Sequence, residues 1–223
     1  MRVLIGCESS GTVRNAFRAL GHDAWSCDVL PADDLSEFHL TGDLLTFLGD
    51  GWDIMIAHPP CTYLTVSAAW AFGPGPYHQQ VKPGTLVGEA RRAAREDALA
   101  FVRALMNAPI ARVALENPVG AISSRIRPAD QYIQPFQFGD DASKRTGLWL
   151  KGLRPLRIDP SARVAGRVVG TDARGHPVER WANQTDGGQN RLPPGADRWK
   201  ARSKTYSGIA RAMAAQWGCG DLP

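Results

Sequence analysis

The stretch MRVLIGCESSGTVRNAFRALG (residues 1–21) decides the fold. Its first seven residues form an apolar run that is too short for a helix and is typical of a buried strand. After it, Val13, Phe17 and Leu20 recur at helical spacing, and Gly21 is a natural helix stop. A strand, a glycine-containing turn and a helix in this order are the first unit of a parallel α/β sheet.

The same alternation continues along the chain. Further strands are expected at residues 23–29, 52–57, 111–117 and 145–153. Helices are expected at residues 42–51, 88–108 and 208–218. The sequence therefore predicts an α/β fold with a mostly parallel sheet and helices on its faces.

The length of 223 residues suits one main core with a small appendage. Residues 152–204 contain many Gly, Pro and Arg and show little periodicity, so we expect a small, irregular, basic subdomain there. The predicted division is a core at 1–151, this insertion at 152–204, and a terminal helix at 205–223 that returns to the core.

The composition excludes several classes of protein. There is no signal-peptide pattern and no apolar run long enough to cross a bilayer, so we expect a cytoplasmic protein with no membrane partner. The four cysteines are far apart and form no CxxC pair, which predicts free thiols rather than a disulfide framework or a metal site.

Positive charge is concentrated in one part of the chain. Residues 1–143 carry 11 Lys and Arg against 16 Asp and Glu, whereas residues 144–211 carry 15 against 5. A concentrated basic segment in an otherwise mildly acidic protein is what a phosphate backbone attracts, so the charge favours a nucleic-acid partner. A basic surface with no partner is the alternative.

Polar and chemically active residues follow the predicted strands. The strands end in residues 6–11, at Asp28, in residues 59–61 and in residues 116–117. In open parallel sheets ligands gather at the carboxyl ends of strands, so these four ends are expected to form one cleft. The glycine spacing of GCESSG differs from the GxGxxG of dinucleotide-binding proteins. Asp28 is placed to accept hydrogen bonds from ribose hydroxyls, or else to cap a turn.

Cys61 and Glu116 are the residues in this cleft that suit covalent chemistry. A thiol is a nucleophile if its pKa is lowered, although a single cysteine is more often a small buried apolar residue. A buried glutamate is expected to have a raised pKa and to donate a proton. Together they form a workable pair for addition to a conjugated ring, while His58 is expected to have a structural role.

The order of these motifs resembles that of the S-adenosylmethionine-dependent DNA cytosine-5 methyltransferase family, in particular its compact bacteriophage-type members. The PC motif of the family matches Pro60-Cys61, and its ENV motif matches Glu116-Asn117-Pro118. Its basic QKRxR stretch is matched in part by Lys144 and Arg145, because Gly147 replaces the second arginine. The resemblance covers most of residues 1–150 and 203–218.

The resemblance implies a Rossmann-like methyltransferase fold and a role for each matching residue. The implied catalytic residues are Cys61, Glu116 and Arg145. The implied S-adenosylmethionine-binding residues are Gly6, Glu8, Ser9, Ser10, Gly11, Asp28, Asp43 and Pro59. The expected DNA-binding residues are Pro60, Asn117, Lys144, Arg191, Lys200 and Arg202.

The implied reaction is methylation of cytosine at carbon 5 through a covalent cysteine adduct. The thiolate would add at carbon 6 while a protonated Glu116 donates to ring nitrogen 3. The target base would be flipped out of the duplex, and residues 66–88, rich in Gly and Pro, would form a lid over it.

Two other functions fit the sequence, and two more are disfavoured by particular residues. The same chemistry on a free cytidine nucleotide such as dCMP is possible because only about fifty residues are available to recognise DNA. A catalytically inactive relative that only binds nucleic acid is the second alternative. Amino methylation is disfavoured because His58 and Cys61 occupy the places of the (D/N/S)PP(Y/F/W) motif, and a zinc deaminase because PCTYLT lacks a second cysteine.

Overall fold

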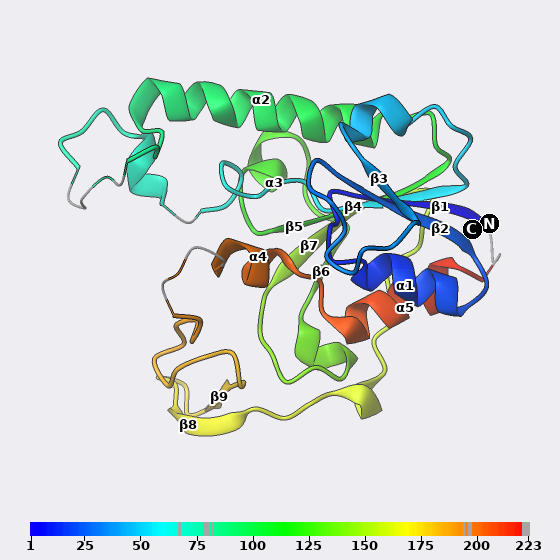
Figure 1. The fold of residues 1–223 in the computed structure, drawn as a ribbon. Coiled ribbons are helices and arrows are strands. Elements are labelled where there is room, and N and C mark those ends of the chain that lie inside the picture. The colour runs from blue at the N-terminus through cyan, green and yellow to red at the C-terminus, as the bar shows by residue number, and fades with distance from the viewer. Residues whose placement is uncertain (67, 78–80, 82, 194, 196–197, 220–223) are drawn as a thin grey trace.

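The computed structural model describes residues 1–66, 68–77, 81, 83–193, 195 and 198–219. A seven-stranded sheet runs through its centre (Figure 1). The strands are β1 (Arg2–Gly6), β2 (Asp23–Asp28), β3 (His39–Thr41), β4 (Ile54–Ala57), β5 (Arg112–Pro118), β6 (Gln131–Ile133) and β7 (Thr146–Lys151). The helices are α1 (Thr12–Ala19), α2 (Gly88–Met106), α3 (Ala121–Arg125), α4 (Arg198–Ser203) and α5 (Ser207–Trp217).

The strand order is β3-β2-β1-β4-β5-β7-β6. β1 pairs in parallel with β2 and β4, and β4 pairs in parallel with β5. β7 is antiparallel to both of its neighbours, β5 and β6. The prediction of a mostly parallel sheet in a Rossmann-like α/β fold of the methyltransferase type is therefore confirmed.

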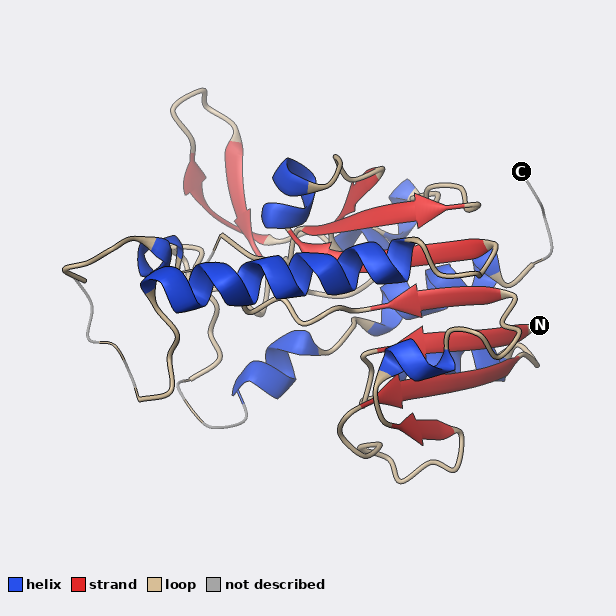
Figure 2. Cartoon of the chain, turned by 90° about the horizontal axis from the view of Figure 1, so that it is seen from above, coloured by secondary structure: helices blue, strands red, loops and turns tan. Residues whose placement is uncertain are grey.

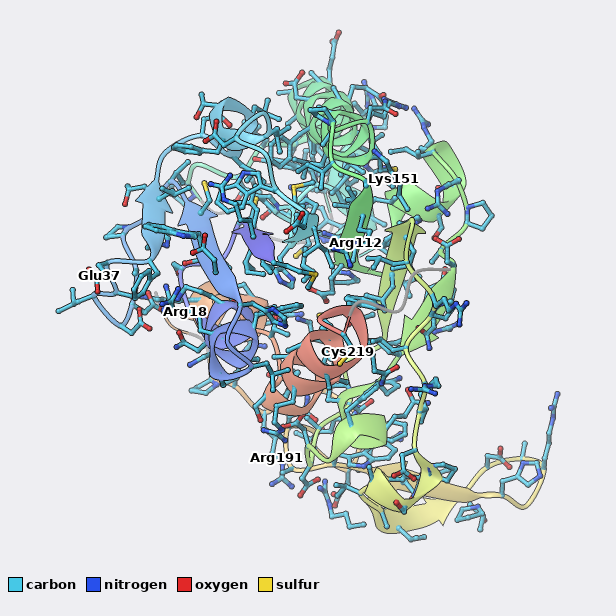
Figure 3. The ribbon with its side chains drawn as sticks, turned by 90° about the vertical axis from the view of Figure 1, so that its right-hand side faces the viewer. Arg18, Glu37, Arg112, Lys151, Arg191 and Cys219 are labelled. Carbon is cyan, nitrogen blue, oxygen red and sulfur yellow. The ribbon has the colours of Figure 1, made fainter. Side chains whose placement is uncertain are left out.

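Helices cover both faces of the sheet, and the alternation of side chains along β1 shows why. Val3 and Ile5 belong to the core cluster that contains α1 and α5, whereas Leu4 belongs to the cluster that contains α2. Figure 3 shows the sheet between these two layers. Because β1 is buried on both sides, its sequence is a continuous apolar run, as expected for a central parallel strand.

The parallel strands end at one edge of this sheet. The arrowheads of β1, β2 and β4 point toward the side where the loop before α2 and helix α4 lie (Figure 2). This is the edge where a ligand of an open parallel sheet is expected.

Several short elements were not foreseen. The helix expected at 42–51 is only one 3₁₀ turn, η1 (Leu44–Phe47), because Gly42 and Gly51 have positive φ angles of 157° and 76° that end it on either side. Strands β3 and β6 have three residues each, which is too few for a periodic pattern. The other 3₁₀ turns are η2 (Ala69–Phe72), η3 (Pro135–Phe138) and η4 (Pro160–Ala162).

The basic segment is more ordered than its sequence suggests. It forms a hairpin of β8 (Arg167–Thr171) and β9 (Pro177–Arg180), followed later by α4. Trp181 stacks on Phe136 with ring centroids 4.1 Å apart and an interplanar angle of 7°, and its indole nitrogen donates to the Val164 carbonyl. The sequence does not predict this small core, because the core depends on two stacked rings that are far apart in the sequence.

The described residues contain no candidate membrane-spanning helix and no candidate metal-binding cluster. Among the helices that the structure describes, none is long and apolar enough to cross a membrane. Within those same residues, no group of three or more His, Cys, Asp and Glu side chains is arranged to hold a metal ion.

Candidate active site

A cavity of about 530 Å³ opens at the carboxyl edge of the sheet. It is lined by Cys7, Cys27, Asp28, Val29, Gly42, Asp43, Leu44, Pro59, Pro60, Thr62, Tyr63, Ala94, Asp97, Ala98 and Phe101. The predicted convergence of strand ends is therefore present for β1, β2 and β4. The wall contributed by α2 was missed, because Ala94 and Phe101 fit an ordinary apolar helix face.

Asp28 and Asp43 are the carboxylates from two neighbouring loops of this cavity. Asp28 ends β2 and accepts a hydrogen bond from the Leu30 amide at 3.0 Å. Asp43 caps η1 by accepting from the Leu45 amide at 3.0 Å. Each carboxylate is fixed by one backbone amide and keeps further acceptor capacity for a ligand.

The turn after β1 has a different arrangement from the one expected. Glu8 is buried, and its carboxylate accepts from the amides of Val13 at 2.7 Å and Arg14 at 3.2 Å, so it caps the start of α1. The Ser10 hydroxyl lies 3.1 Å from that of Thr12. Gly11 has a φ of 67°, which favours glycine.

At this turn the chain packs closely against Leu44 and also forms part of the cavity wall. A Cβ atom on Gly6 would lie 2.3 Å from a Leu44 methyl group. Cys7, with a φ of 56°, contributes to the cavity wall. The lining does not include the predicted cofactor residues Gly6, Glu8, Ser9, Ser10 and Gly11, so their part in binding a cofactor stays a prediction.

Glu116 is buried at the end of β5 and is bonded to His58. His58 Nδ1 lies 2.8 Å from Glu116 Oε2, and the two side chains are 8% and 9% exposed. The sheet register produces this contact, because Ala57 pairs with Leu115 and the next residue of each strand lies alongside the other. The expectation that His58 is purely a packing or capping residue missed this bond.

The expected raised pKa of Glu116 is wrong. Burial alone would raise this pKa, but the charge of Lys144 and the hydrogen bonds from His58 and Thr146 outweigh burial and lower it to about 2. Glu116 is therefore a carboxylate at neutral pH when the site holds no substrate. In that state it accepts hydrogen bonds and has no proton to donate.

Cys61 follows the two prolines after β4 and is half-buried. Burial raises the pKa of its thiol, Lys144 and Arg202 lower it, and Glu116 raises it; the net direction is upward. The thiol is thus protonated at rest, and its pKa is not lowered as nucleophilic attack requires. The same Lys144 charge acts on Cys61 and Glu116, which brings the two predicted catalytic side chains into one electrostatic environment.

The two basic residues before β7 have different surroundings. The Lys144 charge acts on Cys61 and Glu116, and its amide donates to Gln134 Oε1 at 2.9 Å. Arg145 is exposed, and its guanidinium carbon lies 4.5 Å from the centre of the Tyr132 ring. A catalytic role for Arg145 stays a prediction, whereas Lys144 lies nearer the reacting groups than its expected DNA-binding role required.

Asn117 fixes the loop that carries the thiol. Its side-chain nitrogen donates to the Pro59 carbonyl at 2.7 Å, and its side-chain oxygen is buried with no hydrogen-bond partner among the described residues. Pro59 and Pro60 both line the cavity. The two rigid prolines and the Asn117 bond therefore fix the backbone just before Cys61, although the cavity lining includes neither Cys61 nor Glu116.

The loop before α2 is fastened to that helix by arginines. Arg91 donates to the carbonyls of Leu86 and Thr62, Arg92 to that of Phe72, and Arg95 to that of Tyr63. The predicted lid at 66–88 includes residues 67, 78–80 and 82, which lie outside the described residues.

The predicted DNA-binding residues of the basic segment lie on its C-terminal part. Lys200 forms an ion pair with Asp33 at 2.7 Å, and Arg202, also on α4, is exposed and acts on Cys61. Arg191 is exposed, and its amide donates to the Asn183 carbonyl. In contrast, the Arg167 guanidinium is used internally by the Asp186 carboxylate and the Gln184 carbonyl.

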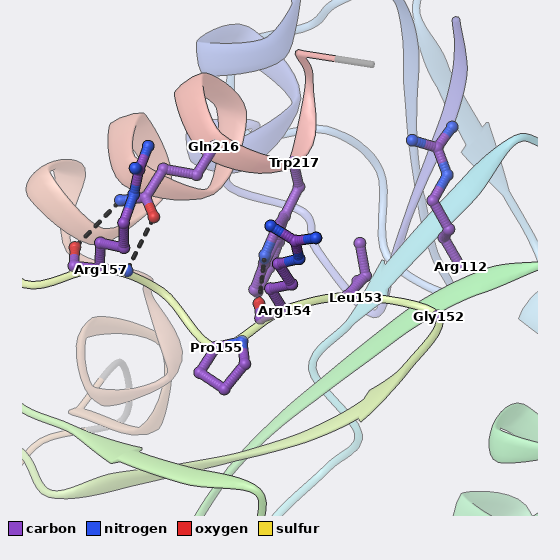
Figure 4. Close-up of a pocket in the computed structure, with 8 residues that line it drawn as sticks. All are labelled: Arg112, Gly152, Leu153, Arg154, Pro155, Arg157, Gln216 and Trp217. Atoms are coloured by element: carbon purple, nitrogen blue, oxygen red, sulfur yellow. Dashed lines mark hydrogen bonds between the residues drawn. The ribbon is translucent and has the colours of Figure 1, made fainter. Parts of the chain in front are cut away.

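A second, smaller pocket of about 150 Å³ lies at the opposite edge of the sheet (Figure 4). It is lined by Arg112, which begins β5, and by residues after β7, including Arg154 and Arg157. Gln216 bonds to the backbone of Arg157, and the Trp217 indole donates to the Arg154 carbonyl. This pocket lies at the opposite edge of the sheet from Cys61 and Glu116, so it is not part of the candidate active site.

The sequence matches no model of a known protein family, and no curated protein matches it either. Among solved structures, it is similar to a protein described as a candidate DNA modification methyltransferase encoded within a prophage of E. coli. The TM-score is 0.43 and the identity 15%, over 72% of this chain. The chain spans about half, 52%, of the length of that protein. So distant a similarity gives no information about function.

Changing Lys144 to Met is expected to raise the pKa values of both Cys61 and Glu116, because one positive charge that lowers both is removed. Alkylation of Cys61 by iodoacetamide, followed by peptide mass spectrometry across a pH series, measures the first effect. Its midpoint should move to higher pH in Lys144→Met and stay in place in Arg145→Met. Equal shifts in the two variants would show that Lys144 has no special position.

The depressed pKa of Glu116 makes folding stability depend on acid. Because the carboxyl has a lower pKa when folded, its stabilisation is present above the ordinary value of 4.5 and is lost as the pH falls toward about 2. The wild type should lose roughly 2–3 kcal/mol more than Glu116→Gln across this window. Urea unfolding at several pH values measures the difference, and parallel pH curves would contradict it.

Proposed function

We propose that the protein is an S-adenosylmethionine-dependent methyltransferase that methylates carbon 5 of cytosine in DNA. The observation that carries this proposal is the shared environment of Cys61 and Glu116, both under the charge of Lys144, beside a cavity that Asp28 and Asp43 line. A thiol and a carboxylate that share one electrostatic environment suit covalent addition to a pyrimidine ring.

The cavity fits the proposed methyl donor in size and in polar groups. A volume of about 530 Å³ lies within the usual range for small-molecule sites. Asp28 would accept from ribose hydroxyls and Asp43 from the adenine amino group, while Leu44 and Phe101 offer apolar contacts. S-adenosylmethionine would supply a methyl group on a positively charged sulfur.

The residues of this chain would handle the pyrimidine. The Cys61 thiol gives up its proton, which passes to ring nitrogen 3, while the sulfur bonds to carbon 6, so carbon 5 becomes nucleophilic. After methylation, carbon 5 and nitrogen 3 each lose a proton and the sulfur is expelled. Glu116, ionised in the resting site, would accept from the N3–H and the 4-amino group of the adduct, in place of the proton donation expected from the sequence.

DNA is favoured over a free nucleotide because of the positive charge near the thiol. Lys144 and Arg202 both act on Cys61, and they come from the segment before β7 and from α4. The exposed Arg191 adds to the same C-terminal part of the basic segment. One phosphate needs fewer charges than this, whereas a polymer backbone contacts several.

The test is to incubate the protein with methyl-labelled S-adenosylmethionine and either duplex DNA or dCMP, and then to identify the labelled nucleoside after digestion. Label in 5-methyldeoxycytidine from DNA is the expected result. Label from dCMP alone would support the nucleotide alternative. Label on an exocyclic amine would contradict carbon-5 chemistry, and no label from either substrate would favour a binding protein.

DNA binding is expected to weaken with salt, and Arg202→Ala should reduce the slope of log K against log salt by about 1, because one phosphate contact is lost. Fluorescence anisotropy at several salt concentrations measures the slope. Arg103→Ala, an exposed arginine in the last turn of α2, is the control and should leave the slope unchanged. A salt-independent affinity in the wild type would contradict a polymer substrate.

A further inference from the structure

The residue before the two prolines has a contact that the proposed reaction has not used. His58 Nδ1 lies 2.8 Å from Glu116 Oε2, and both side chains are more than nine-tenths buried. An ionised carboxylate has no hydrogen to give, so Nδ1 must carry the hydrogen of this bond. The bond therefore fixes the tautomer of the ring and one oxygen of the carboxylate together.

The other ring nitrogen of His58 is unusual. Nε2 is buried and has no hydrogen-bond partner among the residues that the structure describes, and the same is true of Asn117 Oδ1 beside Glu116. A buried polar atom without a partner costs about 1–3 kcal/mol. If His58 only filled space, an apolar side chain would fill the same space without the cost of an unpartnered buried nitrogen.

The groups that act on Glu116 and on the neighbouring Cys61 come from several parts of the chain. Lys144 precedes β7 and acts on both, Thr146 begins β7 and bonds to Glu116, and Arg202 on α4 acts on Cys61. Thr146 and Lys144 act on the same carboxylate as His58, so three partners hold it from different directions. Among them, the contact from His58 is a buried hydrogen bond from the residue that begins the HPPC segment.

We propose that His58 is a positioning residue for the methylation reaction, one that holds Glu116 Oε2 so that the remaining acceptor capacity of the carboxylate can serve the nucleobase. This inference rests on the proposed function, because it assigns Glu116 to the base. His58 touches the carboxylate and acts on the pyrimidine only through it. It also keeps Glu116 in the acceptor state that suits the N3–H and 4-amino donors of the adduct.

Two variants test this role by single-turnover methylation of duplex DNA across a pH series. His58→Ala removes the bond and should slow the reaction on the order of a hundredfold, with cofactor affinity unchanged. His58→Gln offers a side-chain N–H and should recover part of that rate. In both variants the acid limb of the profile should move to higher pH, because the loss of the imidazole raises the pKa of Glu116.

The matched control is His176→Gln, a histidine in the β8–β9 hairpin whose side chain is 72% exposed. It should keep the wild-type rate and pH profile. If His58→Ala and His58→Gln fold and also keep both, the positioning role is overturned. A purely structural role would change stability and leave the acid limb in place.

A second measurement separates this inference from the proposed function. Nitrogen NMR of the His58 ring in the protein without substrate should show hydrogen on Nδ1, and the signal should change in Glu116→Leu, which cannot accept the bond. Identical ring signals in both proteins would overturn the inference even if the wild type methylates DNA. The expected signals together with no methylation of DNA or dCMP would support the contact and reject the proposed function.

Discussion

Replacing Cys61 with serine is expected to abolish methyl transfer, with a fall in turnover of about 10⁴-fold or more. A serine hydroxyl is a much weaker nucleophile than a thiol, and Lys144 and Arg202 cannot lower its pKa enough to ionise it. The measurement is incorporation of labelled methyl groups into DNA. Binding of S-adenosylmethionine, measured by calorimetry, should be unchanged, because Asp28 and Asp43 line the cavity independently of the thiol.

The control for this experiment is Cys219→Ser, which replaces an exposed thiol and should leave turnover at the wild-type level. A serine variant of Cys61 that still methylates at a substantial rate would rule out the nucleophile assignment. Loss of turnover together with loss of cofactor binding would indicate that the loop has been displaced, and the nucleophile assignment would then lack support.

Replacing Glu116 with glutamine is expected to lower turnover about 10³-fold, within the range for loss of one preorganised hydrogen-bonding group that stabilises the transition state. The amide has nearly the shape of the carboxylate, so the sheet should remain intact. It has only one oxygen left to accept from His58 and from the adduct, because the other terminal atom is now an NH₂ group. Single-turnover rates at saturating DNA and cofactor measure the effect.

The matched control is Glu96→Gln on α2, an exposed carboxylate paired with Arg125. It should retain wild-type turnover, because a surface ion pair contributes little to stability or to the site. Near-normal product formation by Glu116→Gln would remove Glu116 from the mechanism.

The sequence predicts the main sheet well because each central strand is buried on both faces. Residues 3–6 and 54–57 are short apolar runs, and such runs are typical of strands buried on both faces of a parallel sheet. The hairpin β8–β9 could not be predicted in this way. It has exposed residues on most of its length, and its order depends on the stacking of Trp181 on Phe136, which are distant in sequence.

The sequence indicates which residues meet at the cavity better than it indicates the protonation state of Glu116. The ends of β2, β3 and β4 bring Asp28, Asp43 and Pro59 to one cavity, as the strand order requires. The protonation state of Glu116 depends on His58 and Lys144, whose distances from it are set by the register of β4, β5 and β7. A sequence pattern shows that a carboxyl group is buried, but not which partners surround it.

The central claim is that the Cys61 sulfur bonds covalently to cytosine. The most direct test is to mix the protein and S-adenosylmethionine with duplex DNA that contains 5-fluorocytosine, whose fluorine cannot leave as a proton. If Cys61 is the nucleophile, the expected product is a DNA–protein complex that survives denaturation and maps to the peptide containing residue 61. Efficient methylation of ordinary DNA with no trapped complex, or a complex that maps to another residue, would contradict it.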